Sequence, residues 1–533
     1  MYKNIAFLFK NKKIEDNFNF YLWLTFLVAV AIGLLNHEMW RDELEAWLIA
    51  KDSISIPEML NNLKYTGHPA LWYLCLHFIS KVTTNPLVIQ LFNLIVITAA
   101  LFIFIYYSPF NYLQKTLFCF SYFPLYEYGI ISRSYSLEML LIFSFCALFC
   151  QKKHNYILLT IVLFLLPHTN IYGLILGFIF AAIFFWTAVA KAIYNQKDSS
   201  EWRRIGIALS LSLTTYLISL SAAIIQITPP ADAKRIGRSA SANSGLFQFI
   251  QSSEAVITGI WRSYVPIPNF SLENSWGTNI LAENIFLPEI ANIDLGSFLS
   301  AVMSLVLFAI FTVIFARNYK ALFTYVAGNA LIIAFNLKYK LPDIRHNGHL
   351  FILLIVCFWI FLSEAQTNYA KSRPRVLKAL SSQQNFLLTI ILCIQLYAGI
   401  KMYAVDLGRV FSNSQNVARY IKNNQLEQST IVGSRYRIVF PLSAWLDRPI
   451  YYPEIRKFGT FTVWTSKSVP GNTYISQQEI LQEAAKLKRE NENLLLVLDK
   501  KLGNIDTSLN PKLLASYEDA IVDRENYFIY SID

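Results

Sequence analysis

Three carboxylates occur at helical spacing in residues 36–50, which read NHEMWRDELEAWLIA. Glu38, Asp42 and Glu45 fall at i, i+4 and i+7, so a helix here would place all three on one face. The apolar residues of the opposite face are Trp40, Leu44, Trp47 and Leu48. This pattern predicts a helix lying along the membrane surface, with either a general base and substrate contacts or only a solvated face.

A second polar grouping follows in residues 64–73, KYTGHPALWY. Its glycine and proline predict a turn at the start of an apolar run. This places Tyr65 and His68 at the boundary between water and lipid. Both are candidate substrate contacts, and for His68 an interfacial polar tip or a helix cap is an equal alternative.

Charged residues also interrupt the apolar sequence between residues 126 and 138. Arg133 and Glu138 are the main candidates, with Glu127 preceding them. An unpaired charge at membrane depth costs several kcal/mol, so such groups are usually paired or line a watery cavity. Arg133 and Glu138 therefore either bind substrate or pair with each other.

Two further turns carry polar residues between apolar segments. The turn 166–170 contains His168, a candidate substrate contact for which a plain connecting turn is the better alternative. The segment 343–349, DIRHNGH, contains Arg345 and His346. An arginine can bind phosphate oxygens with two hydrogen bonds, so these two are candidates for binding a lipid phosphate. The alternative is a charged cap on a membrane helix.

The elements that must position these residues are membrane helices. Hydrophobic residues make up 55% of the 533 and charged residues 15%, against roughly 25% in an average soluble domain. The apolar residues form runs of about 20, the length needed to cross a bilayer. The candidate spans are residues 19–36, 69–83, 86–108, 116–131, 135–150, 155–168, 170–190, 206–226, 297–316, 321–337, 348–364 and 385–402. We predict a mainly α, polytopic membrane protein with about 11–13 spans.

The distribution of the basic residues predicts which loops lie on each side of the membrane. The net charge is +11, but the basic residues form short clusters between spans, which argues against nucleic-acid binding. Placing these clusters inside puts the N-terminus in the cytoplasm and the loops 37–68 and 227–296 outside. The six cysteines lie in apolar segments and show no metal-ligand spacing, so no metal ligands are assigned.

The composition changes near residue 403, where charged residues become more frequent and the apolar runs shorten. Helical patterns at 412–424 and 477–491 alternate with strand-like runs at 430–432, 494–498 and 527–532. We therefore predict a transmembrane domain over residues 1–402 and an extracytoplasmic α/β domain over residues 403–533.

Several of these motifs together resemble the C-type glycosyltransferase superfamily, in particular the protein O-mannosyltransferases and the bacterial aminoarabinose transferases of lipid A. The shared features are an acidic pair after the first span (Asp42–Glu43), a His–Pro–x–Leu segment from His68 to Leu71, and a Ser–Arg segment from Ser132 to Glu138. Glu138 stands where the mannosyltransferases have aspartate. The resemblance covers roughly residues 19–365.

The resemblance implies a reaction. The donor would be a sugar on a polyprenyl phosphate, and the acceptor a lipid, glycan or protein outside a bacterial inner membrane. Asp42 would be the catalytic base beside Glu43, and attack of the acceptor hydroxyl would invert the sugar. Glu38 would join the substrate contacts, and a divalent cation is left open. The alternatives are a transporter or flippase of lipid-linked glycans, or an inactive relative that binds them.

Overall fold

The computed structural model describes residues 2–532, apart from 195–198, 234–256, 270–275, 283–288, 291–292, 340, 342, 369–374, 462, 464–474, 490–492, 504–508 and 523. Much of the predicted external loop 227–296 therefore lies outside the described residues. The chain divides into two compact units. The first contains residues 1–35, 93–223 and 240–404, and the second contains residues 36–92, 224–239 and 405–533.

Within the described residues, eight helices are long and apolar enough to cross a bilayer, which makes this a multi-pass membrane protein. They are α1 (Tyr2–Asn36), α5 (Val88–Tyr107), α9 (Ile171–Tyr194), α10 (Ser199–Ile227), α13 (Leu295–Phe315), α14 (Tyr319–Tyr339), α15 (Ile344–Asn368) and α16 (Arg375–Gly408). Shorter apolar helices are α4 (Leu71–Ser80), α7 (Tyr135–Phe149) and α8 (Tyr156–Leu165), which continues into the 3₁₀-helix η2 (Leu166–His168). The mainly α, polytopic fold is confirmed.

Four predicted spans form shorter helices, which accounts for the difference from the expected 11–13. The segment 69–83 forms α4, whose 10 residues rise about 15 Å, half of a bilayer core of about 30 Å. The segment 116–131 is broken into α6 (Tyr112–Cys119) and the π-helix η1 (Tyr122–Glu127). Pro124 lies in η1 and has no N–H to continue a regular α-helix, so an apolar run here does not give one straight span.

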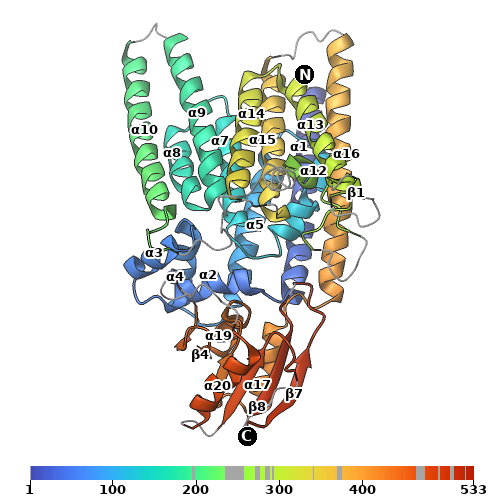
Figure 1. Ribbon diagram of the computed structural model, residues 1–533. Helices are drawn as coiled ribbons and strands as arrows, with labels where there is room; N and C mark the ends of the chain where they lie inside the picture. Colours follow the sequence, from blue (N-terminus) through green and yellow to red (C-terminus); the bar gives the residue numbers. More distant parts are fainter. Residues whose placement is uncertain are drawn as a thin grey trace. The chain divides into compact units, whose positions relative to one another are not determined.

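The first unit is built around α15. Within its span Ile344–Glu364, 78% of an apolar stretch of 18 residues is buried, the largest share among the eight spans described. Helices α7, α12 (Gly259–Tyr264) and α14 pack against it, and α14 also packs against α9 (Figure 1). The polar first turn of α15 is therefore held among several helices. The strands β1 (Glu289–Ile290) and β2 (Ile293–Asp294) precede α13.

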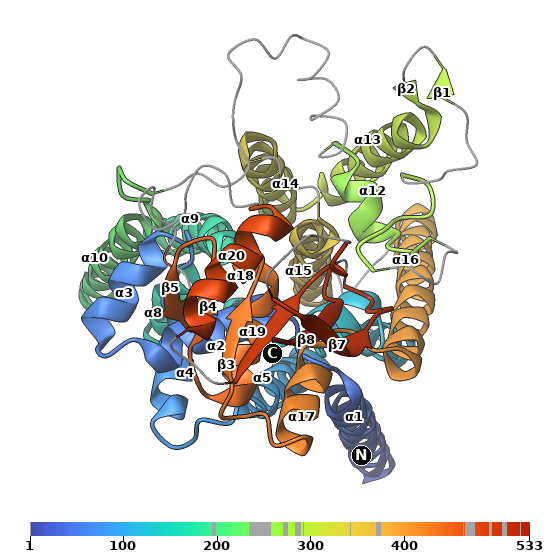
Figure 2. The same ribbon diagram turned by 60° about the horizontal axis from the view of Figure 1, so that its bottom comes forward.

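The second unit contains a six-stranded mixed sheet in the order β5-β4-β3-β6-β8-β7 (Figure 2). Its strands are β3 (Thr430–Gly433), β4 (Ile450–Tyr452), β5 (Lys457–Gly459), β6 (Leu494–Leu498), β7 (Pro511–Tyr517) and β8 (Tyr527–Ile532). β3 pairs in parallel with β4 and β6, whereas the β4–β5, β6–β8 and β7–β8 pairs are antiparallel. The α/β fold predicted for this part of the chain is confirmed, while the domain limits stay predictions.

Helices also lie in this part of the second unit, and one of them packs on the sheet to form a hydrophobic core. They are α17 (Ser414–Asn423), α18 (Tyr436–Val439), α19 (Pro441–Leu446) and α20 (Gln477–Lys488). Ile480, Leu481 and Ala484 of α20 pack with alternate residues of β6 and β8, because the period of two in a strand turns every second side chain to the same face. At one edge, β7 begins at Pro511, and its register with β8 shifts between Leu513 and Ala515.

The helices after the first span also belong to the second unit. They are α2 (Arg41–Asp52) and α3 (Ile56–Lys64), and α2 packs against α3, α4 and α19. α3 begins at Ser55, whose hydroxyl accepts a hydrogen bond from the backbone N–H of Glu58, and Pro57 follows in its first turn. From Glu43 to Ala50 every residue of α2 except Glu45 is buried, so the helix is fixed in this unit.

Candidate functional site

The acidic segment is only partly helical. α2 begins at Arg41, after an extended Trp40 with φ −95° and ψ 177°. The prediction that Glu38 shares a helix face with Asp42 and Glu45 is therefore wrong, because the chain leaves the helix before reaching it. Glu38 instead accepts a hydrogen bond from the backbone N–H of Phe411 at 2.9 Å, and burial raises the pKa of its carboxyl although that bond lowers it.

Asp42 and Glu43 both lie in the first turn of α2 but differ in environment. Glu43 is fully buried, whereas Asp42 is half-buried. Oε2 of Glu43 accepts the backbone N–H of Trp40 at 3.1 Å and lies 3.2 Å from Nε2 of His37. Glu43 therefore caps α2 and pairs with His37, and Asp42 is the more accessible carboxylate of the pair.

His37 lies between two carboxylates. Its Nδ1 is 2.9 Å from Oδ2 of Asp406, on the opposite side of the ring from Glu43. Ionised carboxylates only accept hydrogen bonds, so both ring nitrogens donate and the imidazole is positively charged. Burial disfavours this charge, but attraction to Asp406 and Glu43 outweighs it and raises the pKa of His37 to about 10.

Arg41 provides a second connection at the start of α2. Its backbone N–H and its Nη1 both donate to Oε1 of Glu525, at 3.2 and 3.3 Å. Glu525 has a fully buried side chain. Burial raises the pKa of Glu525 to about 7, although the charge of Arg41 lowers it. The sequence offered no signal for this contact because the two residues lie 484 positions apart.

Tyr65 and His68 lie in the turn that ends α3. The hydroxyl of Tyr65 donates to the carboxylate of Asp232, with O···O distances of 3.2 and 3.4 Å. Nδ1 of His68 donates to the backbone carbonyl of Thr66 at 3.0 Å. Gly67 between them has φ +71°, a left-handed conformation that glycine adopts without strain. The predicted turn is therefore present, and both side chains have polar partners.

In the first unit, Glu138 joins three helices. Its Oε2 accepts from Nδ2 of Asn170, just before α9, at 2.7 Å and contacts Nε2 of His349, on α15, at 2.8 Å. Oε1 of Glu138 is buried and has no hydrogen-bond partner among the residues that the structure describes. The ring of Tyr172 stacks on His349 with centroids 4.0 Å apart. The ion-pair partner that the structure gives Glu138 is thus His349, which the sequence interpretation did not select.

The basic candidates of the first unit lie around this group. The guanidinium of Arg133 lies 5.2 Å from the ring centroid of Tyr135, a cation–π distance. Arg345 and His346 belong to the first turn of α15, where Nη2 of Arg345 lies 3.0 Å from Oδ2 of Asp343. The ring of His346 stacks on the ring of Tyr172, with centroids 5.8 Å apart. A helix N-terminus with an arginine and a histidine is suited to an anion.

Two other residues in this unit have defined roles. Oε2 of Glu127 accepts from the hydroxyl of Tyr122 at 2.8 Å and from Nε1 of Trp276 at 3.1 Å. Nε2 of His168 lies 3.1 Å from Oγ of Ser219 on α10. Because that hydroxyl donates to the carbonyl of Phe164, Nε2 of His168 must be the donor. Glu127 and His168 therefore both hold neighbouring segments together.

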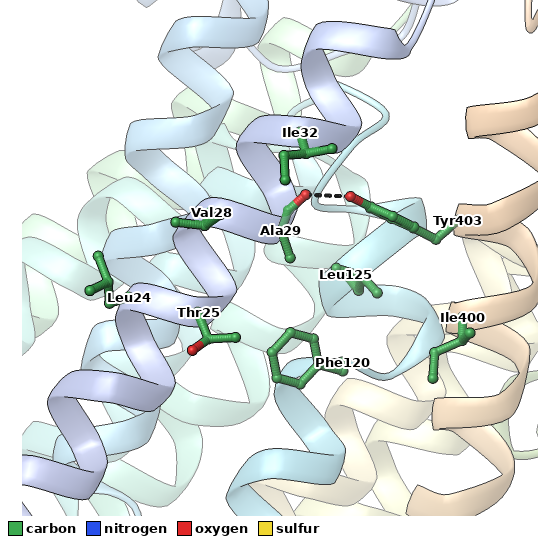
Figure 3. Close-up of a pocket in the computed structure, with 9 residues that line it drawn as sticks. All are labelled: Leu24, Thr25, Val28, Ala29, Ile32, Phe120, Leu125, Ile400 and Tyr403. Atoms are coloured by element: carbon green, nitrogen blue, oxygen red, sulfur yellow. Dashed lines mark hydrogen bonds between the residues drawn. The ribbon is translucent and has the colours of Figure 1, made fainter.

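The groove in Figure 3 has a different character. It has a volume of about 540 Å³ and is lined by Leu24, Thr25, Val28, Ala29, Ile32, Phe120, Leu125, Ile400 and Tyr403. The hydroxyl of Tyr403 donates to the carbonyl of Ala29 across it. Among the described residues, the lining contains no carboxylate and no basic side chain, so this groove suits hydrocarbon and not bond-making chemistry.

Among the residues that the structure describes, no group of three or more His, Cys, Asp or Glu side chains is arranged to hold a metal ion. The divalent cation considered from the sequence stays a prediction.

No protein-family model matches the chain, and no curated protein matches it. Two crystal structures of ArnT from Cupriavidus metallidurans are similar to it. The structure bound to undecaprenyl phosphate has a TM-score of 0.45 and 11% identity, and the apo structure has 0.41 and 13%. Each comparison covers 96% of this chain and 97% of the other. Both TM-scores lie below 0.5.

Proposed function

We propose that this protein is an integral membrane glycosyltransferase. It moves a sugar from a polyprenyl-phosphate donor to an acceptor hydroxyl outside the inner membrane, with inversion at the anomeric carbon. The observation that carries the proposal is the first turn of α2, directly after the first span. There Glu43 is buried in the helix cap, while Asp42 is half-buried beside it.

In this reaction Asp42 takes the proton of the acceptor hydroxyl as its oxygen attacks the anomeric carbon. The bond from that carbon to the phosphate oxygen breaks, and its electron pair leaves with the polyprenyl phosphate. The transition state resembles an oxocarbenium ion, as in glycoside hydrolysis, so a nearby carboxylate stabilises its positive charge. A base in this position typically contributes about 10²–10⁴-fold to the rate.

Substrate contacts are proposed for the remaining candidates. Arg345 and His346 would offset the charge of the leaving phosphate, because both lie in the first turn of α15. Arg133 and Glu138 would contact the sugar or the acceptor, and Glu38, Tyr65, His68 and His168 stay candidates for the same role. The isoprenoid chain of the donor needs an apolar path, and the groove of Figure 3 has the chemistry for it.

The test uses purified protein in liposomes with radiolabelled polyprenyl-phosphate sugars and extracts of acceptor lipids. Wild type should release label from the donor, and Asp42→Asn should lower that rate by about 10²–10⁴-fold at unchanged expression. Glu58→Gln is a matched control, because Glu58 is also a first-turn carboxylate, on α3. Near-normal release by Asp42→Asn would refute the assignment of the base.

The same liposomes separate this proposal from transport. Movement of intact donor between leaflets, with no covalent product from any donor, would favour a transporter or flippase. Donor binding without release or movement would favour an inactive relative. Adding a chelator to the active preparation tests the dependence on a divalent cation.

A further inference from the structure

Several segments that are distant in sequence converge on the residues just before α2. His37 follows the first span, and Asp406 lies 369 positions later, at the end of α16. Nε2 of Gln90, at the start of α5, donates to the carbonyl of His37 at 2.9 Å. The ring of Phe411 packs on His37 with centroids 4.4 Å apart. His37 is therefore fixed by its ring nitrogens, its carbonyl and its ring face.

We propose that Asp406, acting through His37 and Glu43, is a positioning residue for Asp42. This inference rests on the proposed function, since it assigns a purpose to the chain of contacts behind the proposed base. Asp406 orients His37, His37 holds the carboxylate of Glu43, and Glu43 caps the turn that carries Asp42. It also changes the role of Glu43, from a catalytic residue to a positioning residue.

The bond geometry favours this role. In the first turn of α2 the backbone N–H groups of Glu43 and Leu44 both reach the carbonyl of Trp40, at 3.1 and 3.2 Å. The N–H of Trp40 itself is held by the carboxylate of Glu43. A rotation of Glu43 would therefore release the cap and let the turn that carries Asp42 move. His37 prevents this rotation because it pairs with Glu43 on one side and Asp406 on the other.

The charges favour the same role. Burying two carboxylates and one imidazolium costs desolvation free energy. Apolar residues of similar volume often give a protein of equal or greater stability. Hydrogen bonds between charged groups are directional, however, and fix orientation more closely than apolar contacts do. Such a cluster is suited to a site where a shift of about 1 Å can cost 10²-fold in rate.

Asp406→Asn is the informative variant. Asparagine keeps the shape of the side chain and can still accept from His37, but it removes one of the two charges that hold the ring. Because Asp406 is buried and acts on Asp42 through His37 and Glu43, we expect kcat per folded protein to fall about 10- to 100-fold with the KM for the lipid donor unchanged. Hydrogen exchange of the amides in residues 41–48 should become faster in the same variant.

Asp447→Asn is the matched control. Asp447 is also an acidic residue that contacts α2, with Oδ1 2.7 Å from Nζ of Lys51 in the last turn. It has φ +52°, which asparagine also adopts readily. This variant removes a charged contact at the far end of the same helix, so kcat and the exchange of residues 41–48 should stay at wild-type values.

The outcomes separate this inference from the proposed function. Lower kcat at constant KM together with faster exchange supports the positioning role. Faster exchange with unchanged kcat, or unchanged exchange, overturns it. A matching rise in KM also overturns it, since that points to a donor contact. If wild type transfers no sugar from any donor, the proposed function fails, and the exchange of residues 41–48 alone shows whether Asp406 holds this turn.

Discussion

Replacing Glu138 by glutamine should destabilise the protein although the two side chains have nearly the same shape. A single oxygen of Glu138, Oε2, accepts from Asn170 and also contacts Nε2 of His349. Nδ1 of His349 faces the carbonyl of His346 at 2.9 Å, so Nδ1 must carry a proton. The contact between Nε2 of His349 and Oε2 of Glu138 therefore contains one further proton. That proton is either on Nε2, which makes an ion pair, or on the carboxyl group, which makes a neutral pair.

Glutamine cannot reproduce both bonds at this position. If its oxygen occupies the place of Oε2, it accepts from Asn170, but His349 must then stay charged without a counter-charge or lose a bond. If its nitrogen occupies that place, it donates to His349 but opposes the N–H of Asn170. One bond to a charged or buried group is lost either way, which costs about 1.5–3 kcal/mol. Glu138→Ala, which leaves both partners unpaired, should cost about 3–5 kcal/mol.

Thermal unfolding in detergent measures these costs. A loss of 1 kcal/mol lowers the Tm by about 2–4 °C in domains of 150–250 residues and by less in larger ones such as the first unit, so Glu138→Gln should lower it by a few degrees. Ser144→Ala is the control on the same helix, because this hydroxyl donates only one turn back, to the carbonyl of Leu140. A double-mutant cycle with Asn170→Ala should show a coupling above 0.5 kcal/mol. Additive effects would refute the shared-oxygen argument.

Two other predictions concern stability. Because the pKa of Glu525 is about 7 in the folded protein and its ordinary value is 4.5, the folded state binds more protons between these values, so this group lowers stability as pH rises through that window. Glu525→Gln should therefore gain Tm relative to wild type between pH 5 and pH 8, and a constant difference would contradict this. A Cβ on Gly399 would lie 2.7 Å from the carbonyl oxygen of Phe120, so Gly399→Ala should cost about 1–3 kcal/mol. For Gly206→Ala, no described atom outside the neighbouring helix backbone lies within 4 Å of the new Cβ, so the Tm should not fall. Equal losses in both variants would exclude the steric explanation.

The sequence predicted many helices and strands, because the burial of their side chains produces recognisable patterns of apolar residues. The strand-like runs 494–498 and 527–532 coincide with β6 and β8, and most long apolar runs coincide with the long helices. It did not predict the break at η1, because an apolar run carries no signal for a change of helix type. It also extended the helix of the acidic segment back to Glu38, because carboxylate spacing alone does not locate a helix start.

The candidate site residues stay predictions, but the structure shows partners for them that the sequence did not indicate. Asp42 and Glu43 lie together in one turn, as adjacent residues must, and Glu138 and Arg133 are buried or half-buried as expected for charges in an apolar region. Their partners come from elsewhere in the chain. Asp406 lies near the end of an apolar helix, where an acidic residue carries no distinct signal, and His349 lies three residues after the candidate His346. Folding within each unit brings such residues to their partners, Asp406 to His37 and His349 to Glu138.

The edges of the six-stranded sheet have a consequence for a protein crowded in a membrane. Exposed strand edges can pair between copies and cause aggregation. Here β7 begins at Pro511, carries Lys512 next to it, and changes register after Leu513, while β5 has only three residues and begins at Lys457. Proline, lysine, a bulge and short length all discourage intermolecular strand pairing. Neighbouring copies can therefore reach high density in the bilayer without joining through these sheets.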